Sequence, residues 1–446
     1  MTDLVVGIDS STQSCKVLVC DATTLEVVRE AKTSHPDGTE VDPELWWDAL
    51  KAAIQQAGGL SGVKALSVGG QQHGLVALNA EGRVVRKALL WNDTRSADQA
   101  EQLIAKFGKK FLTEHTGSVP VASFTATKLL WVSQNEPELA KTIAAVCLPH
   151  DYLTWRLAGY GPEGESEFGP QLNELVTDRS DASGTGYFDG TKNEYVQEIL
   201  DFVIDHKIVL PKVLKAAEVA GKLSPKLGAE LGSTSEVLLG GGMGDNAGAA
   251  MGLNLQSGDI AISIGTSGTI FGVVPGPSAD ESAAIAGFAS ADGHYLPLIC
   301  TLNAARVLDW AAKLLNVDFD ELGRLALAAK PGADGVKLTP YFEGERTPNL
   351  PDATATIEGL RIGTGTRENI ARAAIEGMLR GLGVGKEVLE AKGFEINKIF
   401  LIGGAAANPA VQQIARDLFG EGVTVPKANE YVALGAARQA ASLLKN

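Results

Sequence analysis

The residues of this chain best suited to chemistry lie in polar turns between apolar segments. The first turn, residues 9–14, joins the apolar stretch 5–8 to another at 16–20. A plain two-residue hairpin usually closes with Asn-Gly or Asp-Gly, whereas this turn is longer, lacks glycine and carries Asp9 among four hydroxyl side chains. Its N–H and hydroxyl groups can hold a phosphate, and Asp9 can hold Mg²⁺ through water. The alternative is a turn whose hydroxyls only satisfy its own backbone.

A second turn of the same kind occurs in the other half of the chain. The Gly-Thr-Ser-Gly sequence at residues 265–268 follows the apolar stretch 260–264 and precedes another at 269–274. Two such hairpins, one from each half, can clamp a nucleotide phosphate from both sides. Neither a P-loop, G-x-x-x-x-G-K-[ST], nor a G-x-G-x-x-G fingerprint lies between a strand and a helix. The pattern therefore indicates two related halves that face a common cleft.

Asp245 follows a run of glycines, at residues 240–242 and 244, that lets the backbone approach a substrate. An aspartate there can accept the proton of an attacking hydroxyl, as phosphoryl transfer requires. The alternative is an Asx turn or helix N-cap at Asp245 and Asn246.

Two further turns combine hydrogen-bonding side chains. Gln72 and His73 are flanked by glycines, and Trp91 and Asp93 follow an apolar run. These side chains suit a polyol, but a single histidine in such a turn is more often structural. Near the C-terminus, an apolar stretch at 399–402 enters a third small-residue turn at 403–409.

The elements that must position these turns follow from local patterns. Short β-branched runs predict strands at 4–8, 16–20, 25–31, 237–239, 260–264, 269–274 and 399–402. Residues 63–68 and 75–78 are interpreted as a further strand pair. Asp42 and Pro43 are typical of a helix start. Trp46 and Trp47 follow in this helix and are interpreted as residues that pack in the core. Further helices are expected at 96–108, 125–135, 192–203 and 410–419, and a closing helix of small residues around Gly435 allows close packing.

Composition narrows the class of protein. With 446 residues the chain is expected to form two or three domains. Its formal net charge of −15 argues against nucleic-acid and anionic-membrane partners. The four cysteines form no C-x-x-C pair and are interpreted as small buried hydrophobic residues of a reducing compartment. No window is apolar enough to span a membrane and no leader is apparent, so we expect a cytoplasmic protein.

Many of these stretches together resemble the FGGY carbohydrate kinases. The matching segments run in order along nearly the whole chain: GIDSSTQS (7–14), GQQHG (70–74), LLWNDTR (89–95), FTATKLLWV (124–132), LPHDYLTWRLAG (148–159), SDASGT (180–185), GGMGDNAGA (241–249), SIGTSG (263–268), LDWAAKLL (308–315), PYFEGERTP (340–348), ARAAIEG (371–377) and LIGGAA (401–406). The resemblance is strongest toward the members that act on D-xylulose. It implies an actin-like ATPase (ribonuclease H-like) α/β fold with two domains around a deep cleft. Residues 1–238 would then form the sugar side and residues 239–446 the ATP side.

The resemblance also implies roles for single residues. Asp245 would be the general base, and Asp9 would orient the phosphate and hold Mg²⁺ through water. The implied sugar contacts are Gln72, His73, Asp245, Asn246, Trp91 and Asp93. The implied ATP and phosphate contacts are Ser11, Thr12, Gln13, Gly265, Thr266, Ser267, Gly403, Gly404, Ala405 and Asn408. The reaction would be the transfer of phosphate from ATP to D-xylulose, giving D-xylulose 5-phosphate.

Departures from the family pattern leave alternatives open. Ser10 and Ser11 stand where many members carry a small or apolar residue and then glycine, Thr127 replaces a common proline, and Asn349 replaces a frequent histidine. A kinase for another ketose, a polyol or an aldonate is the nearest alternative, because sugar isomers differ by few contacts. A non-catalytic actin-like sugar-binding module is more remote. A monomer and a homodimer are both compatible with the sequence.

Overall fold

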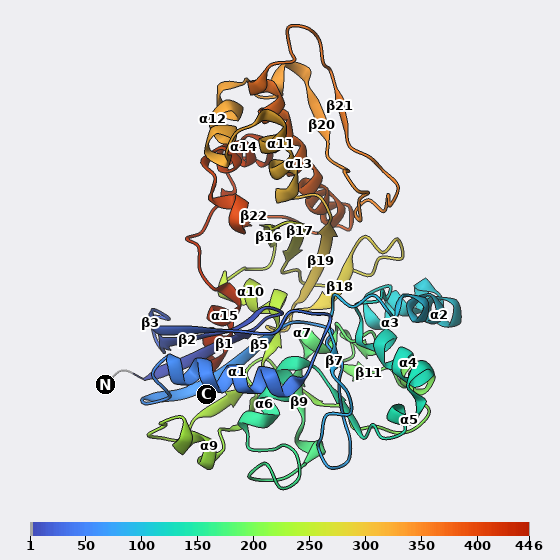
Figure 1. Cartoon of the computed structure of the whole chain (residues 1–446), viewed down its shortest axis with the longest axis vertical. Coiled ribbons are helices and arrows are strands. Elements are labelled where there is room, and N and C mark those ends of the chain that lie inside the picture. The colour runs from blue at the N-terminus through green and yellow to red at the C-terminus, as the bar shows by residue number, and fades with distance from the viewer. Residues whose placement is uncertain (1–2, 446) are drawn as a thin grey trace.

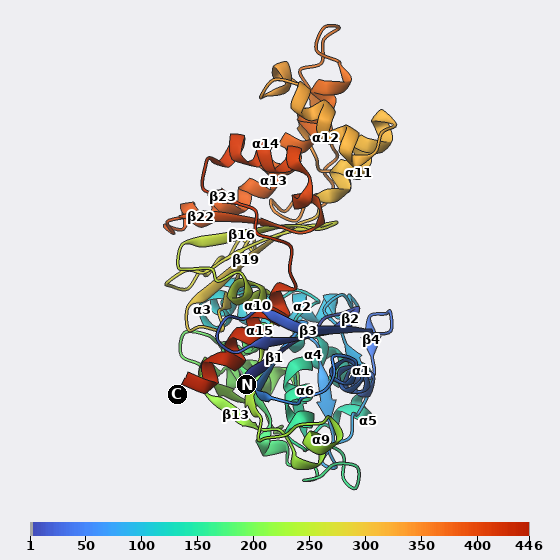
Figure 2. The same ribbon diagram turned by 90° about the vertical axis from the view of Figure 1, so that its left-hand side faces the viewer.

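A computed structural model describes residues 3–445 and divides them into two lobes. In Figure 1 the first lobe, blue to green, lies below the second, yellow to red. The C-terminal helix α15 (Tyr431–Ser442) is the exception, because it returns to the first lobe and lies beside β1 (Leu4–Ser10). Figure 2 shows the same return from the side.

The first lobe is built on a seven-stranded mixed sheet. Its strand order is β13 (Val219–Lys222), β14 (Leu238–Gly240), β5 (Val63–Gly70), β1, β2 (Ser14–Asp21) and β3 (Val27–Ser34), with β15 (Met243–Gly244) also paired to β5. Strands β1, β2 and β3 are antiparallel, and β5 is parallel to β1. The register pairs Ser10 with Cys15, so the first polar turn closes this hairpin.

The second lobe repeats this arrangement. Its six-stranded sheet has the order β18 (Ala286–Ala289), β19 (Tyr295–Thr301), β17 (Gly268–Gly272), β16 (Asp259–Ile264), β22 (Lys398–Ile402) and β23 (Val423–Thr424). Strand β16 pairs antiparallel with β17 and parallel with β22, as β1 does with β2 and β5. The repeat predicted from two similar hairpins is therefore confirmed by topology.

Helices cover both sheets and fill the space around them. In the first lobe they are α1 (Pro43–Gln56), α2 (Ala97–Phe107), α3 (Lys109–Thr116), α4 (Thr125–Asn135), α5 (Pro137–Ala140), α6 (Pro149–Leu157), α7 (Arg179–Ala182), α8 (Gln197–Val203) and α9 (Pro225–Glu230). In the second they are α10 (Asp245–Gly252), α11 (Ala305–Leu315), α12 (Phe319–Ala328), α13 (Arg367–Ala391) and α14 (Pro409–Phe419). The remaining strands are short: β4 (Glu40–Val41), β6 (Val76–Leu78), β7 (Ala88–Leu89), β8 (Ala145–Cys147), β9 (Val176–Asp178), β10 (Phe188–Asp189), β11 (Glu194–Tyr195), β12 (Lys212–Leu214), β20 (Lys337–Thr339) and β21 (Thr356–Glu358).

Several local predictions are confirmed. Helix α1 begins with Asp42 as N-cap, whose side chain accepts a hydrogen bond from the Glu44 N–H, and Pro43 occupies the first turn. Trp46 and Trp47 are buried core residues. Helix α4 spans the predicted residues 125–135. Cys15, Cys20 and Cys147 are buried, Cys300 is partly buried, and all four are free thiols.

Two predictions about elements are wrong. Strand β6 pairs with β8, not with the segment at 63–68, because β5 already has β1 on one side and β14 on the other. The helix expected from residue 192 begins at Gln197, and Glu194 and Tyr195 pair with β10 instead.

The predicted domain boundary after residue 238 stays a prediction; Leu238 is the first residue of β14, a strand of the first sheet.

Close packing around small residues joins α10 to α15, as predicted for Gly435. A Cβ atom added to Gly435 would lie 2.0 Å from the Gly248 carbonyl oxygen, and one added to Gly252 would lie 1.9 Å from that of Tyr431. The two helices therefore approach at backbone distance. No helix within residues 3–445 has both the length and the apolar character needed to cross a membrane.

Candidate active site

A cavity of about 810 Å³ opens where β1 faces the second lobe. Asp9 and Lys16 line it from the first lobe. Its other wall contains Gly403 and Gly404 from the turn after β22, and Arg416 from α14. This volume is within the usual range for a small-molecule or cofactor site.

Asp9 stands near the end of β1 and is 4% exposed. Its Oδ1 is buried without a hydrogen-bond partner among residues 3–445, and its Oδ2 lies 3.7 Å from the Lys16 Nζ. Burial raises the pKa of Asp9 to about 6, although Lys16 opposes the rise. A buried carboxylate oxygen that lacks a protein donor fits a hydrated divalent cation, since Mg²⁺ keeps most of its water and takes few carboxylates.

Hydrogen bonds from Ser11 to Ser14 close the first polar turn. The backbone N–H and the hydroxyl of Ser11 both donate to the Ser14 carbonyl, at 3.0 and 2.9 Å. Gln13 is exposed, and the buried hydroxyl of Ser10 has no partner among the described residues. Ser10 and Ser11, the two residues that depart from the family pattern, thus differ in their contribution to the turn. The Ser11 hydroxyl helps to close it, and the Ser10 hydroxyl does not.

The second polar turn lies open to solvent. Gly265, Thr266 and Ser267 are all exposed between β16 and β17. The Gly265 carbonyl accepts a hydrogen bond from the Ala305 N–H at 2.9 Å, which ties the turn to the start of α11. The hydroxyls of Thr266 and Ser267 make no side-chain hydrogen bond to residues 3–445, so they are available to a ligand.

Asp245 is the first residue of α10 and is partly buried. The N-cap is Gly244, not Asp245. The Asp245 Oδ1 accepts hydrogen bonds from the backbone N–H and the side-chain amide of Asn246, at 2.7 and 2.8 Å. Its Oδ2 accepts none from the described residues. Burial first, and then the negative charge of Asp9, raise the pKa of Asp245 to about 7.

Gln72 is hydrogen-bonded to the residue that follows Asp245. The Asn246 side-chain amide donates to the Gln72 Oε1 at 3.1 Å. A Cβ added to Gly244 would lie 2.7 Å from the Gln72 amide nitrogen, so the glycine lets β15 approach this turn. The structure thus brings Gln72 next to Asp245 and Asn246, which are far from it in the sequence.

His73 follows Gln72 and has a left-handed backbone, with φ = 68°. Its Nδ1 lies 2.6 Å from the Gly184 carbonyl oxygen. The imidazole stacks on Phe124 and lies beside Phe288 of the second lobe, with ring centroids 4.9 and 5.6 Å away. Both lobes therefore surround the predicted sugar turn.

Trp91 and Asp93 have different surroundings. Trp91 is 48% exposed, and its indole N–H donates to the Thr12 hydroxyl at 2.8 Å, which links it to the first polar turn. Asp93 is buried, and its carboxylate accepts hydrogen bonds from the Arg95 side chain and backbone, which lower its pKa. The Asp93 carboxylate is thus already paired within the protein.

The predicted adenosine side is the turn after β22. Gly403 and Gly404 are exposed and line the cavity, Ala405 is partly buried, and Asn408 caps α14 by accepting from the Ala410 N–H at 2.9 Å. The Asn408 amide also donates to the Phe319 carbonyl. Its polar atoms are therefore already used in packing α14 against α12.

Sequence reasoning missed several residues that line the cavity. Gln412 and Arg416 follow Asn408 at helical intervals, so this spacing was a signal that could have found them. Lys16 and Glu430 form an ion pair of 2.5 Å beside Asp9. They lie far apart in the sequence, and no local pattern predicts their meeting.

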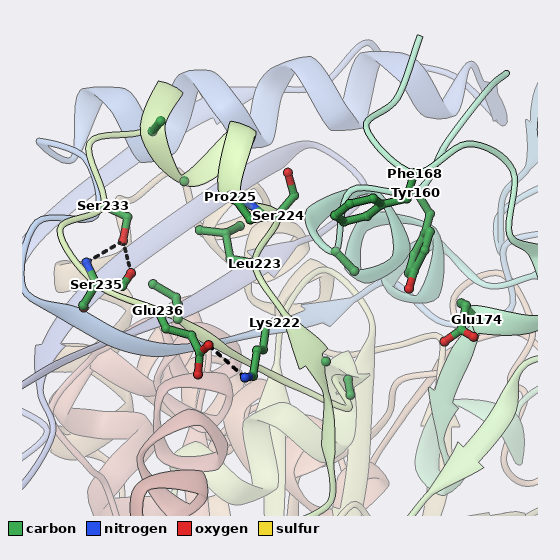
Figure 3. A pocket seen from close by; sticks show the side chains of 16 residues that line it. Tyr160, Phe168, Glu174, Lys222, Leu223, Ser224, Pro225, Ser233, Ser235 and Glu236 are labelled. Carbon is green, nitrogen blue, oxygen red and sulfur yellow. Dashed lines mark hydrogen bonds and ion pairs between the residues drawn. The ribbon is translucent and has the colours of Figure 1, made fainter. Parts of the chain in front are cut away.

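A separate cavity of about 800 Å³ lies in the first lobe, beside α9. Figure 3 shows the side chains that line it, among them Tyr160, Phe168 and Glu174. Its Lys222 and Glu236 pair with each other at 2.8 Å. None of the predicted site residues lines this cavity. The candidate active site is therefore the cavity beside Asp9, together with Asp245, whose pKa the charge of Asp9 raises.

Comparison with known proteins assigns the chain to a family. Residues 4–252 match the N-terminal domain, and residues 260–444 the C-terminal domain, of the FGGY family of carbohydrate kinases. A xylulose kinase of Streptomyces coelicolor is 46% identical over 99% of this chain and 88% of its own length, and one of Streptomyces rubiginosus is 45% identical over the same shares. The crystal structure of xylulose kinase from Bifidobacterium adolescentis has a TM-score of 0.94 and 48% identity, covering 100% of this chain and 93% of the other. These matches confirm the predicted two-domain α/β fold of the actin-like type, and the chain belongs to the FGGY family of carbohydrate kinases.

Proposed function

We propose that this protein phosphorylates D-xylulose to D-xylulose 5-phosphate with ATP. The observation that carries the proposal is the pair of carboxylates, Asp9 and Asp245, which lie close enough for the charge of Asp9 to raise the pKa of Asp245. One faces the cavity that is large enough for a nucleotide, and the other is joined through Asn246 to the Gln72 turn. The choice of sugar is supported by the full-length similarity to xylulose kinases.

Asp245 acts as the general base in this proposal. Hydrogen bonds from Asn246 fix its Oδ1, which leaves Oδ2 to accept the proton of the sugar hydroxyl. A raised pKa suits this task, because a base is most effective when its pKa is near the working pH. Gln72 and Asn246 bind and orient the sugar, while His73 accepts a hydrogen bond from one of the sugar hydroxyls.

Asp9 and the two polar turns hold the phosphates of ATP. The Asp9 Oδ1, which has no protein partner, would hold Mg²⁺ through water, and the ion would neutralise charge on the transferring phosphate. Thr266 and Ser267 donate from the second lobe, and Thr12 contributes from the first. Gly403 and Gly404 let the nucleotide approach the backbone after β22. Positioning and charge neutralisation supply most of the catalysis, as is usual for phosphoryl transfer.

The base assignment is tested by Asp245→Asn. The amide keeps the size of the side chain but is a far weaker proton acceptor, so we expect turnover to fall at least ~10²-fold while xylulose binding, measured by calorimetry, stays nearly intact. Asp309→Asn, an exposed position on α11, is the matched control and should leave turnover unchanged. Unaltered turnover in Asp245→Asn would refute the assignment.

The substrate is tested separately by ADP release over a panel of ketoses, polyols and aldonates. We expect the highest kcat/KM with D-xylulose. A higher value for ribulose, gluconate or glycerol would replace the proposed substrate but keep the kinase mechanism. No ADP release with any acceptor would favour a non-catalytic sugar-binding module.

A further inference from the structure

The backbone of His73 is held in an unfavourable conformation by side chains of α4. A left-handed φ is unfavourable for a residue other than glycine, because the Cβ approaches the backbone carbonyl oxygen. The His73 carbonyl oxygen accepts two side-chain hydrogen bonds, from the Thr125 hydroxyl at 3.2 Å and from the Lys128 Nζ at 3.1 Å. Both donors come from the start of α4, so this helix end offsets the cost of the turn.

A lysine is an unusual hydrogen-bond donor at this position, because the side chain of Lys128 is completely buried. Its Nζ also donates to the Ser123 carbonyl. No carboxylate of residues 3–445 lies within salt-bridge distance of it. Burial lowers its pKa to about 7, and the more distant negative charge of Asp93 opposes the shift. Burying an ammonium group without a directly paired carboxylate is costly. The two carbonyl oxygens are therefore the contacts that explain its position.

A hydrogen bond to the loop that contains Gly184 fixes the imidazole ring of His73. The Gly184 carbonyl can only accept a hydrogen bond, so the Nδ1 at 2.6 Å must carry the proton. The Ala126 N–H of α4 donates to the Thr185 carbonyl at 2.8 Å, which anchors this loop to the same helix end. Burial, together with the positive charge of Lys128, lowers the pKa of His73 to about 3 and keeps its ring neutral.

A neutral ring protonated at Nδ1 presents a lone pair at Nε2. Nε2 accepts no hydrogen bond from residues 3–445. The ring packs against Phe124 and Phe288, whose own centroids lie 6.0 Å apart, and turning it over would break the hydrogen bond from Nδ1 to the Gly184 carbonyl. Nε2 therefore pairs with a donor, such as a hydroxyl of the ligand.

We propose that Lys128 is a positioning residue of the sugar site: together with Thr125 it fixes His73 so that Nε2 accepts a hydrogen bond from one sugar hydroxyl. This inference rests on the proposed function in one respect, which is that the donor to Nε2 is a sugar hydroxyl. The tautomer of His73 and its dependence on Lys128 are properties of the ligand-free protein.

Kinetics of Lys128→Met test the link to the sugar. Methionine fills similar apolar space without a donor, so we expect the KM for xylulose to rise about tenfold, as for the loss of one hydrogen bond, with kcat and the KM for ATP little changed. Thr125→Val should raise the same KM, and Thr125→Ser, which restores the hydroxyl, should recover it. Lys110→Met, at an exposed position on α3, is the matched control.

Deoxy analogues of xylulose identify the hydroxyl. With the analogue that lacks the paired hydroxyl, wild type and Lys128→Met should have equal KM values. An unchanged KM for xylulose in both Lys128→Met and Thr125→Val would overturn the proposal, as would a loss confined to kcat.

Nitrogen-15 NMR of the ligand-free protein tests the positioning without any substrate. The chain has six histidines, so the His73 resonances can be assigned by their loss in His73→Gln. We expect a protonated Nδ1 and an unprotonated Nε2 at neutral pH, and a mixture of tautomers in Lys128→Met. A protonated Nε2, or a charged ring in the wild type, would overturn the inference whichever sugar the enzyme phosphorylates. If Lys128→Met fails to fold, Thr125→Val gives the same readout.

Discussion

The negative charge of the Asp9 carboxylate acts on Asp245. Asp9 is one of the causes of the raised pKa of Asp245. Lys16 limits the corresponding rise at Asp9, and Glu430 holds Lys16 in place from α15. The protonation of the proposed base therefore depends on the charge that surrounds Asp9.

This coupling predicts how activity depends on pH and Mg²⁺. Because the pKa of Asp245 is raised to about 7, the ionised, active form is gained as pH rises through 7 and lost as pH falls. We expect kcat/KM to decline below about pH 7 with unit slope at low free Mg²⁺. A cation beside Asp9 cancels part of its charge, so higher Mg²⁺ should move the midpoint to lower pH. Profiles at two Mg²⁺ concentrations measure this. A rate that is constant down to the ordinary aspartate pKa of about 3.9 would contradict it.

The site residues that could be proposed from the sequence are those that carry a local signal. Asp9 closes an apolar run, and Asp245 follows a glycine run, so their chemistry could be suspected from neighbouring residues. Lys128 and Glu430 could not be found in this way. Their importance comes from contacts with His73 and Lys16, which only the folded chain brings near. The detailed roles of the cleft residues stay predictions.

Elements with a strong local pattern were predicted well, and pairings between elements were not. Helix α4 and the start of α1 follow from periodicity and capping, which act over a few residues. The partner of β6 depends on which edges of the first sheet are free, and β5 has no free edge. Sheet pairing is set by the whole lobe, so a pattern of short strands cannot fix it.

The close contact between α10 and α15 predicts that one methyl group added at Gly435 lowers the stability of the protein. Replacing glycine by alanine inside a helix gains up to about 1 kcal/mol from propensity, but at Gly435 the new Cβ would meet the Gly248 carbonyl oxygen at 2.0 Å. Backbone cannot move aside as a side chain can, and overpacking costs about 1–3 kcal/mol. We expect Gly435→Ala to lower the free energy of unfolding, measured with urea.

The matched control is Gly381→Ala in α13. There the added Cβ would lie 3.8 Å from its nearest neighbour, the Pro340 side chain, which is ordinary contact. This variant should be neutral or slightly stabilising. Equal effects of the two substitutions would show that the close approach of α10 and α15 does not limit stability.

The two lobes are joined by more than the connecting chain. Arg179 of α7 donates to the His294 carbonyl at 2.5 Å, and the Ser183 hydroxyl accepts from the Ala289 N–H at 2.9 Å. Phe288 of the same second-lobe hairpin lies against the His73 ring. A sugar that contacts His73 is therefore bound where one lobe touches the other, while the cavity beside Asp9 is walled by both.

This arrangement predicts that sugar and nucleotide together draw the lobes closer. Closure would exclude water, which otherwise competes with the sugar as phosphate acceptor. We expect small-angle X-ray scattering to show a smaller radius of gyration with xylulose plus a non-hydrolysable ATP analogue than with either ligand alone. Asp245→Asn should compact to the same extent with xylulose and ATP itself, because it binds both but turns over slowly. An unchanged radius in both proteins, at ligand concentrations shown by calorimetry to saturate them, would mean that the cleft works without closure and that the phosphate turns already stand at their working distance.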